Sequence, residues 1–188
     1  LFIISQLLFA EDFPTRGIEV TPVAITDLDA VRAAMRPNTR VIYAEVLSNP
    51  WMRVSDIPAL AKIAHASKAL LVIDNTFLSP AVVRPLELGA DLVLHATTKW
   101  LAGHGDAIGG VVSGAKALVD PIRRQTDLLG QAASPFNSWL ISRGARTLSL
   151  RIERASANAS KLAALLEAHP KVEWVRHPSL ASHPDRDV

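Results

Sequence analysis

Short apolar runs that recur between helix-like segments constrain the fold of this chain more than any other feature. They are rich in aliphatic residues and cover residues 18–25, 41–44, 69–73 and 91–95. Runs with little polar alternation are typical of strands that are covered on both faces. Helix N-cap residues follow the first two runs, at Asp27 and at Ser55-Asp56. The pattern predicts an α/β fold with a mostly parallel sheet flanked by helices.

The two ends of the chain predict further elements. We expect Leu1 to Ala10 to form an amphipathic core helix, and Val172 to Val175 to form a strand. Between them, Ser134-Pro135 is a good helix start, and apolar residues then recur every three or four positions, which predicts one long helix over residues 135–168. The predicted organisation is therefore part of a large domain at 1–134, an interdomain helix at 135–168 and the start of a C-terminal domain at 169–188. We expect the chain to be a fragment of a longer protein.

Composition argues against several classes of partner. The 20 basic and 18 acidic residues are interspersed and leave a formal net charge of +2, so neither nucleic acid nor an anionic membrane is an expected partner. The chain has no cysteine, which excludes disulfides and thiolate metal sites and fits a reducing, cytoplasmic location. The apolar stretch at Leu1 to Ala10 is too short to span a bilayer.

Two residues that follow predicted strands are candidates for chemistry. Asp74 comes directly after the run at 69–73, and ligands of open parallel sheets bind at the carboxyl ends of strands. Aspartate is also a common turn residue, so capping of the following turn is the simpler interpretation of Asp74 alone. Lys99 follows the run at 91–95, whereas the other five lysines lie in segments that we expect to be solvated. A lysine in such a place can form a Schiff base with an aldehyde if its free amine is accessible.

Residues around Lys99 suit a phosphate better than a metal. Thr97 and Thr98 carry hydroxyls, and five of the nine glycines lie between residues 103 and 114, where backbone amides could add donors. No Walker-type spacing is present. His95, His104 and Asp106 do not have the spacing of a known metal motif, so we expect no metal site.

The order of these residues resembles the trans-sulfuration family of pyridoxal-phosphate (PLP) enzymes, which act in cysteine and methionine metabolism. The resemblance extends along nearly the whole chain. It is carried by the segments 45–50, 72–77, 84–91, 95–106, 109–110, 134–136, 143–144 and 147–148. It implies the large domain of the aspartate aminotransferase-like fold of PLP-dependent transferases, followed by the start of the small domain.

The resemblance also implies roles for individual residues. Lys99 would be the Schiff-base lysine and the proton shuttle. Asp74 would pair with the pyridine nitrogen, Asn49 would lie near the phenolic oxygen of the ring, and Thr98 would bind the phosphate. Where the family commonly has a phosphate-binding serine, this chain has Ala96. Thr97 could compensate for it.

The resemblance leaves several alternatives open. Its implied reaction is β- or γ-elimination or γ-replacement on an amino acid such as cystathionine, methionine or a homoserine ester. The segment 103–106 is similar to γ-lyases, whereas 77–80 is similar to cystathionine synthases and β-lyases. The family implies a dimer of active dimers and site residues outside this chain, so we expect the fragment alone to be inactive. Other possibilities are a non-catalytic PLP-binding or structural fragment, and a nucleotide-binding domain, although no Gly-x-Gly-x-x-Gly motif is present.

Overall fold

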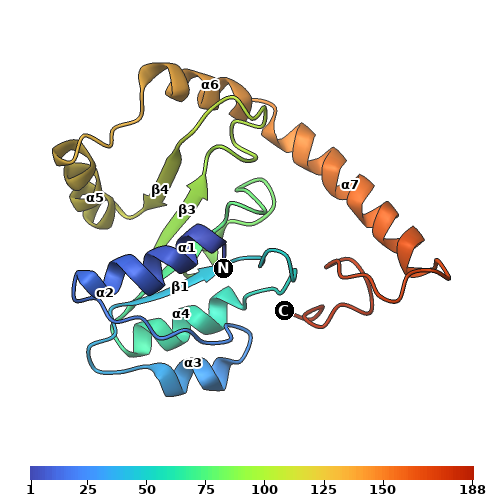
Figure 1. Ribbon diagram of the computed structural model, residues 1–188, viewed down its shortest axis with the longest axis horizontal. Helices are drawn as coiled ribbons and strands as arrows, with labels where there is room; N and C mark the ends of the chain where they lie inside the picture. The colour runs from blue at the N-terminus through green and yellow to red at the C-terminus, as the bar shows by residue number, and fades with distance from the viewer.

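A four-stranded, mostly parallel sheet organises the computed structural model, which describes residues 1–188 (Figure 1). Its strands lie in chain order as β1 (Val41–Glu45), β2 (Leu70–Asp74), β3 (Leu92–Ala96) and β4 (Gly110–Gly114). The first three strands are parallel, and β4 is antiparallel to β3. The prediction of a mostly parallel sheet with flanking helices is confirmed, and the carboxyl ends of β1, β2 and β3 lie at one edge.

One face of the sheet forms the main hydrophobic core. Because side chains alternate along a strand and register partners share a face, Ile42, Leu71, Ala44, Ile73 and Val93 all point to this side. They pack with α4 (Ile57–Ala66), and α3 (Leu28–Ala34) lies beside α4. Both helices begin at the predicted caps: Asp27 accepts a hydrogen bond from the Ala30 amide, and Asp56 accepts one from the Ala59 amide.

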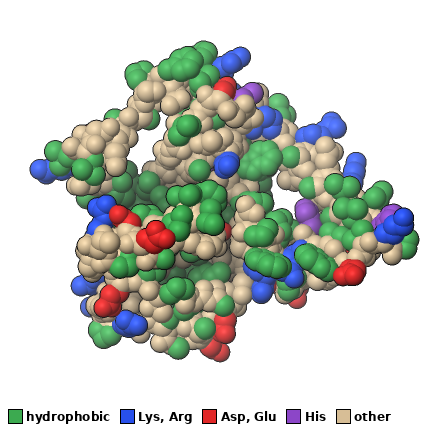
Figure 2. Space-filling model, in the orientation of Figure 1, with side chains coloured by type: hydrophobic (Ala, Val, Ile, Leu, Met, Phe, Trp, Pro, Cys, Tyr) green, Lys and Arg blue, Asp and Glu red, His purple; other side chains and the backbone are tan.

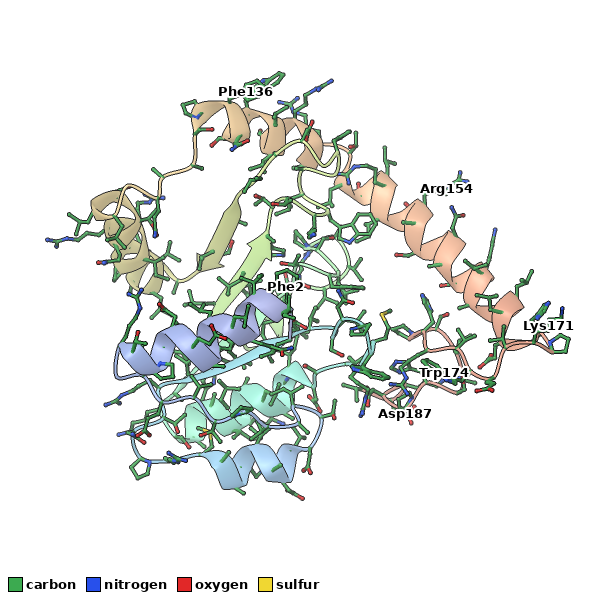
Figure 3. The ribbon with its side chains drawn as sticks, viewed as in Figure 1. Phe2, Phe136, Arg154, Lys171, Trp174 and Asp187 are labelled. Atoms are coloured by element: carbon green, nitrogen blue, oxygen red, sulfur yellow. The ribbon has the colours of Figure 1, made fainter.

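The opposite face carries Tyr43, Glu45 and Asp74 and is crossed by the N-terminal helical segment. This segment consists of α1 (Ile3–Leu7), η1 (Leu8–Asp12) and α2 (Phe13–Thr15). The ring of Phe9 packs edge-on against Tyr43, with 5.0 Å between centroids. The segment is helical as predicted, but the expectation of a core helix is wrong, because none of its residues is buried. Hydrophobic side chains are exposed where it crosses the sheet (Figure 2), and Phe2 marks its start in Figure 3.

Two predicted strands do not form. Residues 18–25 are an exposed connection with no ladder partner, and residues 172–175 lie in an irregular C-terminal segment. An apolar run becomes a strand only where another strand pairs with its backbone, and neither run has such a partner. A short helix, η2 (Pro85–Leu88), ends at Gly89, which has a left-handed φ of 103°.

The single helix predicted over residues 135–168 is also wrong. After α5 (Lys116–Leu128), the chain forms α6 (Pro135–Ala145), which Ser134 caps as predicted, and then a separate helix α7 (Leu148–Glu167). The break lies at Arg146-Thr147, next to the point where Gly144 packs against the turn that follows Lys99. α7 then projects away from the sheet, and the C-terminal segment folds back toward the end of β1 (Figure 1). No helix combines the length and the hydropathy that crossing a membrane requires. The domain boundaries remain a prediction.

Candidate cofactor site

Asp74 is held in a fixed orientation at the carboxyl end of β2. The Tyr43 hydroxyl donates a hydrogen bond to Oδ2 of Asp74 over 3.1 Å, and the Thr76 amide donates one to Oδ1 over 2.9 Å. Burial, reinforced by the negative charge of Asp74, raises the pKa of Tyr43, so the phenol remains a donor at neutral pH. This arrangement fixes the position of a negative charge that remains partly exposed to solvent.

Backbone and side-chain bonds join the end of β2 to the turn that carries Lys99. The Ala96 amide donates to Oγ1 of Thr76 over 2.7 Å, and the indole nitrogen of Trp100 donates to the Phe77 carbonyl over 2.9 Å. The two candidates picked from separate strand ends, Asp74 and Lys99, therefore belong to segments that contact each other. This confirms that the two strand ends are adjacent.

The turn after β3 presents Lys99 to solvent. It is closed by hydrogen bonds from the Lys99 amide to the Ala96 carbonyl and from the Ala102 amide to the Thr97 carbonyl. The Lys99 side chain is exposed, and no carboxylate forms an ion pair with its amine. The other five lysines are exposed as expected, so exposure does not distinguish Lys99 from them. What distinguishes Lys99 from the other lysines is its place after β3, at the same edge of the sheet as Asp74.

Helices α6 and α7 support this turn from behind. A Cβ at Gly144 would lie 2.7 Å from the carbonyl carbon and 2.9 Å from the Cα of Ala102, so only glycine permits the contact. Arg151 in α7 donates through Nη2 to the Trp100 carbonyl over 2.9 Å and to the Gly144 carbonyl over 2.8 Å. The position of the Lys99 turn is therefore set by the junction between the two helices.

The candidate phosphate-binding residues differ in accessibility. Thr98 is half-buried next to Lys99, and Ala96 is exposed. Thr97 is buried, and its hydroxyl, which has no protein partner, lies beside Gly109, where a Cβ would be 2.9 Å away. The Thr97 hydroxyl thus faces the protein interior, which gives no support to the idea that it compensates for Ala96.

Asn49 lies in a hairpin that follows β1. The hairpin is closed by a bridge between Leu47 and Val54 and by a hydrogen bond from the Ser48 amide to the Arg53 carbonyl over 2.9 Å. Asn49 is exposed, and its side-chain amide bonds to no other protein group. The hairpin extends from the same edge of the sheet as Asp74 and Lys99.

Sequence reasoning missed the Tyr43 hydroxyl, which bonds to Asp74. Tyr43 could have been found from strand register, because it pairs with Val72, two residues before Asp74 and on the same face. His95, on the neighbouring strand, was considered as a metal ligand. It is buried, its Nε2 has no partner, and burial lowers its pKa despite the nearby charge of Asp74.

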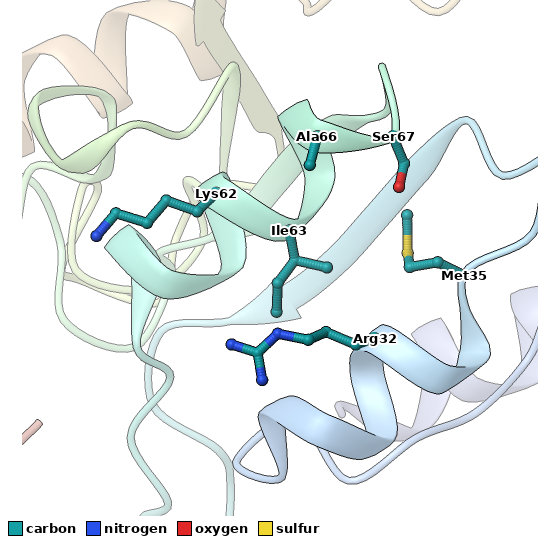
Figure 4. A pocket seen from close by; sticks show the side chains of 6 residues that line it. All are labelled: Arg32, Met35, Lys62, Ile63, Ala66 and Ser67. Atoms are coloured by element: carbon teal, nitrogen blue, oxygen red, sulfur yellow. The ribbon is translucent and has the colours of Figure 1, made fainter.

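The residues present fit PLP. An accessible lysine amine, an oriented carboxylate, the Thr98 hydroxyl and an unbonded amide at Asn49 all come from one edge of the sheet, and their chemistry matches an aldehyde, a pyridinium, a phosphate and a phenolic oxygen. A cavity of about 270 Å³ between α3 and α4, lined by Arg32, Met35, Lys62, Ile63, Ala66 and Ser67, contains none of these groups (Figure 4). This cavity lies among the helices that cover the core face of the sheet and not at the strand edge that carries Asp74 and Lys99.

The model of one protein family, the Cys/Met metabolism PLP-dependent enzymes, matches residues 1–188. The chain belongs to this family. It is 49% identical to an L-methionine gamma-lyase of Pseudomonas putida over 170 residues. This aligned region covers 89% of this chain and 43% of that protein. It is 47% identical over 183 residues to a canavanine gamma-lyase of Pseudomonas canavaninivorans, covering 96% and 46%. A cystathionine gamma-synthase of Mycobacterium tuberculosis is 42% identical over 177 residues, covering 94% and 46%.

A solved structure agrees with this assignment. The crystal structure of cystathionine gamma-lyase from Lactobacillus plantarum complexed with L-serine superposes with a TM-score of 0.94 at 40% identity, covering 97% of this chain and 48% of that one. The fold class and the family resemblance are thereby confirmed. The family is PLP-dependent by its description, and the chain spans about half the length of the relatives it matches.

Proposed function

We propose that the protein containing this chain is a PLP-dependent enzyme that eliminates or replaces a group at the β or γ carbon of a sulfur amino acid. Family membership and the similarity to γ-lyases and a γ-synthase support this activity. The observation that carries it for the site is the Asp74 carboxylate, fixed by Tyr43 and Thr76 next to the Lys99 turn. We further propose a cytoplasmic enzyme that assembles as a dimer of dimers, as the family resemblance implies.

PLP, when bound, supplies an electron sink for the substrate carbanion. The residues of this chain would bind the cofactor and maintain that property. The Lys99 amine would bond covalently to the aldehyde of the cofactor. Once the substrate has displaced it, the same amine would carry protons between carbons of the substrate. The Asp74 carboxylate would keep a proton on the pyridine nitrogen, because a fixed negative charge favours the protonated form. The Thr98 hydroxyl would donate to the phosphate, and the Asn49 amide would donate to the phenolic oxygen.

Absorption spectroscopy of the full-length protein with PLP tests this proposal. We expect a visible band of the lysine-bound cofactor in the wild type, its loss in Lys99→Ala, and its retention in the control Lys62→Ala, which removes an exposed lysine of α4. A wild-type protein without the band would refute PLP binding through Lys99. Release of an α-keto acid from methionine or cystathionine would then separate a lyase from a synthase. Binding of PLP with no turnover of any sulfur amino acid would favour the non-catalytic alternative.

A further inference from the structure

The hairpin that carries Asn49 is held from outside by the C-terminal segment, residues 174–185. Hydrogen bonds join residues of the two segments that are more than 130 positions apart in the chain, and the segments lie side by side in Figure 1. Trp174, labelled in Figure 3, contacts Arg176 of the same segment, and Arg176 contacts the hairpin at Trp51. The contacts reach each of the four hairpin residues from Trp51 to Val54.

Asp185 forms the most extensive of these contacts. Its Oδ2 accepts from Arg53 Nε over 2.6 Å, and its Oδ1 accepts from Arg53 Nη2 over 2.7 Å, which is the bidentate geometry of a strong pair. Oδ2 also accepts from the Val54 amide over 2.9 Å. Asp185 is 8% exposed, so water replaces these bonds poorly. The Arg53 guanidinium lowers the pKa of this carboxyl, which stays ionised at neutral pH.

His183 and Arg176 hold the other half of the hairpin. The His183 Nδ1 accepts from the Asp185 amide over 3.2 Å, so its Nε2 carries the proton and donates to the Met52 carbonyl over 2.8 Å. His183 is 5% exposed. The Arg176 guanidinium lies between two indoles, 5.4 Å from the Trp51 ring centroid and 5.5 Å from that of Trp174.

We propose that Asp185 is a positioning residue for the cofactor site: together with His183 it sets where the hairpin presents Asn49. Asn49 makes no side-chain bond of its own within the protein, whereas the residues that follow Pro50 are each bound by the C-terminal segment. Asp185 acts through its bonds to the Arg53 side chain and the Val54 amide and not by touching the cofactor. This inference rests on the proposed function, in which the Asn49 amide donates to the phenolic oxygen.

Affinity of the full-length protein for PLP tests the inference in a double-mutant cycle. Asn49→Ala removes one hydrogen bond to the cofactor and should raise the Kd for PLP ~2- to 10-fold. Asp185→Ala should raise it within the same range, and the double variant should bind no more weakly than Asn49→Ala alone, because a misplaced hairpin matters only while Asn49 is present. The pH midpoint of the visible cofactor band should shift in the same direction in both single variants.

Controls separate positioning from general destabilisation. Asp29→Ala breaks an exposed aspartate–arginine pair in α3, distant from the hairpin, and should leave both the Kd and the midpoint unchanged. Asp185→Asn keeps an acceptor for the Val54 amide and loses the charge, so it should show a smaller effect and serves as the test if Asp185→Ala does not fold. Unchanged PLP affinity in a folded Asp185 variant would overturn the inference.

Additive effects of Asn49→Ala and Asp185→Ala would also overturn it, since Asp185 would then act independently of Asn49. A wild-type protein that binds no PLP would instead refute the proposed function. In that case hydrogen exchange of the Val54 amide still decides whether Asp185 holds the hairpin. We expect faster exchange in Asp185→Ala than in Asp29→Ala. Equal exchange rates would refute the contact between Asp185 and the hairpin.

Discussion

Gly144→Ala should destabilise the protein even though alanine is the better helix former. Gly144 is a buried residue of α6, and its contact is the backbone of Ala102, which is fully buried. A Cβ at this position would come within 2.7 Å of the Ala102 carbonyl carbon. Backbone cannot rotate away as the end of a flexible side chain can, so α6 and the Lys99 turn must separate.

The magnitude follows from two opposing terms. Overpacking against a rigid neighbour costs about 3 kcal/mol, at the upper end of its usual range. Replacing a helical glycine returns about 1 kcal/mol through backbone entropy and propensity. The net expected loss in the free energy of unfolding is therefore about 2 kcal/mol.

Urea unfolding monitored by circular dichroism measures this loss, with Ser142→Ala as the matched control. Ser142 is an exposed residue of the same helix, and its replacement should change the unfolding free energy by less than about 0.5 kcal/mol. A Gly144→Ala protein as stable as the wild type would show that α6 does not pack closely on the Lys99 turn. The junction between α6 and α7 would then not position the lysine.

Two further variants test the groups around the sheet edge. Asp74→Asn keeps the shape of the side chain but removes its charge, so PLP should bind more weakly by ~1.5–3 kcal/mol, roughly 10- to 100-fold in a fluorescence titration; unchanged affinity would refute its pairing with the cofactor. His95 has a pKa lowered by burial, so it must gain a proton on unfolding below its ordinary pKa of 6.5. Its contribution to stability is therefore present above pH 6.5 and declines as the pH falls toward the folded-state value. His95→Leu should flatten this decline in unfolding experiments across that window, and a wild-type-like pH dependence would contradict the assignment.

Helix caps and aliphatic runs in the sequence correctly predicted the helices and strands that depend mainly on neighbouring residues. Asp56 caps α4, Ser134 caps α6, and the aliphatic runs at 41–44 and 69–73 became adjacent parallel strands. The run at 18–25 has similar residues but no neighbouring strand, and strand formation depends on that partner and not on the run itself.

The break between α6 and α7 could not be predicted from hydrophobic spacing. The apolar stripe continues through Arg146-Thr147, because Ile141, Ala145, Leu148 and Ile152 keep the same spacing on both sides of the break. The break coincides with a tertiary contact, in which Gly144 packs on Ala102 and Arg151 bonds to the Trp100 carbonyl. No residue in the stripe signals that contact.

The candidate site divides in the same way. Asp74 and Lys99 were found because each follows a strand, which is a position that the sequence shows directly. The Tyr43 hydrogen bond depends on strand register, and the Asp185 contact depends on a return of the chain after more than 130 residues. The register follows once β1 and β2 are paired side by side, but the return of the chain to the hairpin leaves no signal in one sequence. The roles of all these residues toward the cofactor remain predictions: Lys99, Asp74, Asn49, Thr98, Thr97 and Ala96.

The long separation between the hairpin and Asp185 has a consequence for synthesis. A ribosome makes the Asn49 hairpin well before residues 174–185, and N-terminal segments begin to fold while synthesis continues. During that interval the strands and the Lys99 turn can already be in place, while the hairpin still lacks the contacts that hold it. Residues 174–185 thus complete the hold on a hairpin that was synthesised much earlier, so the hairpin stays free to move until that later segment has been made.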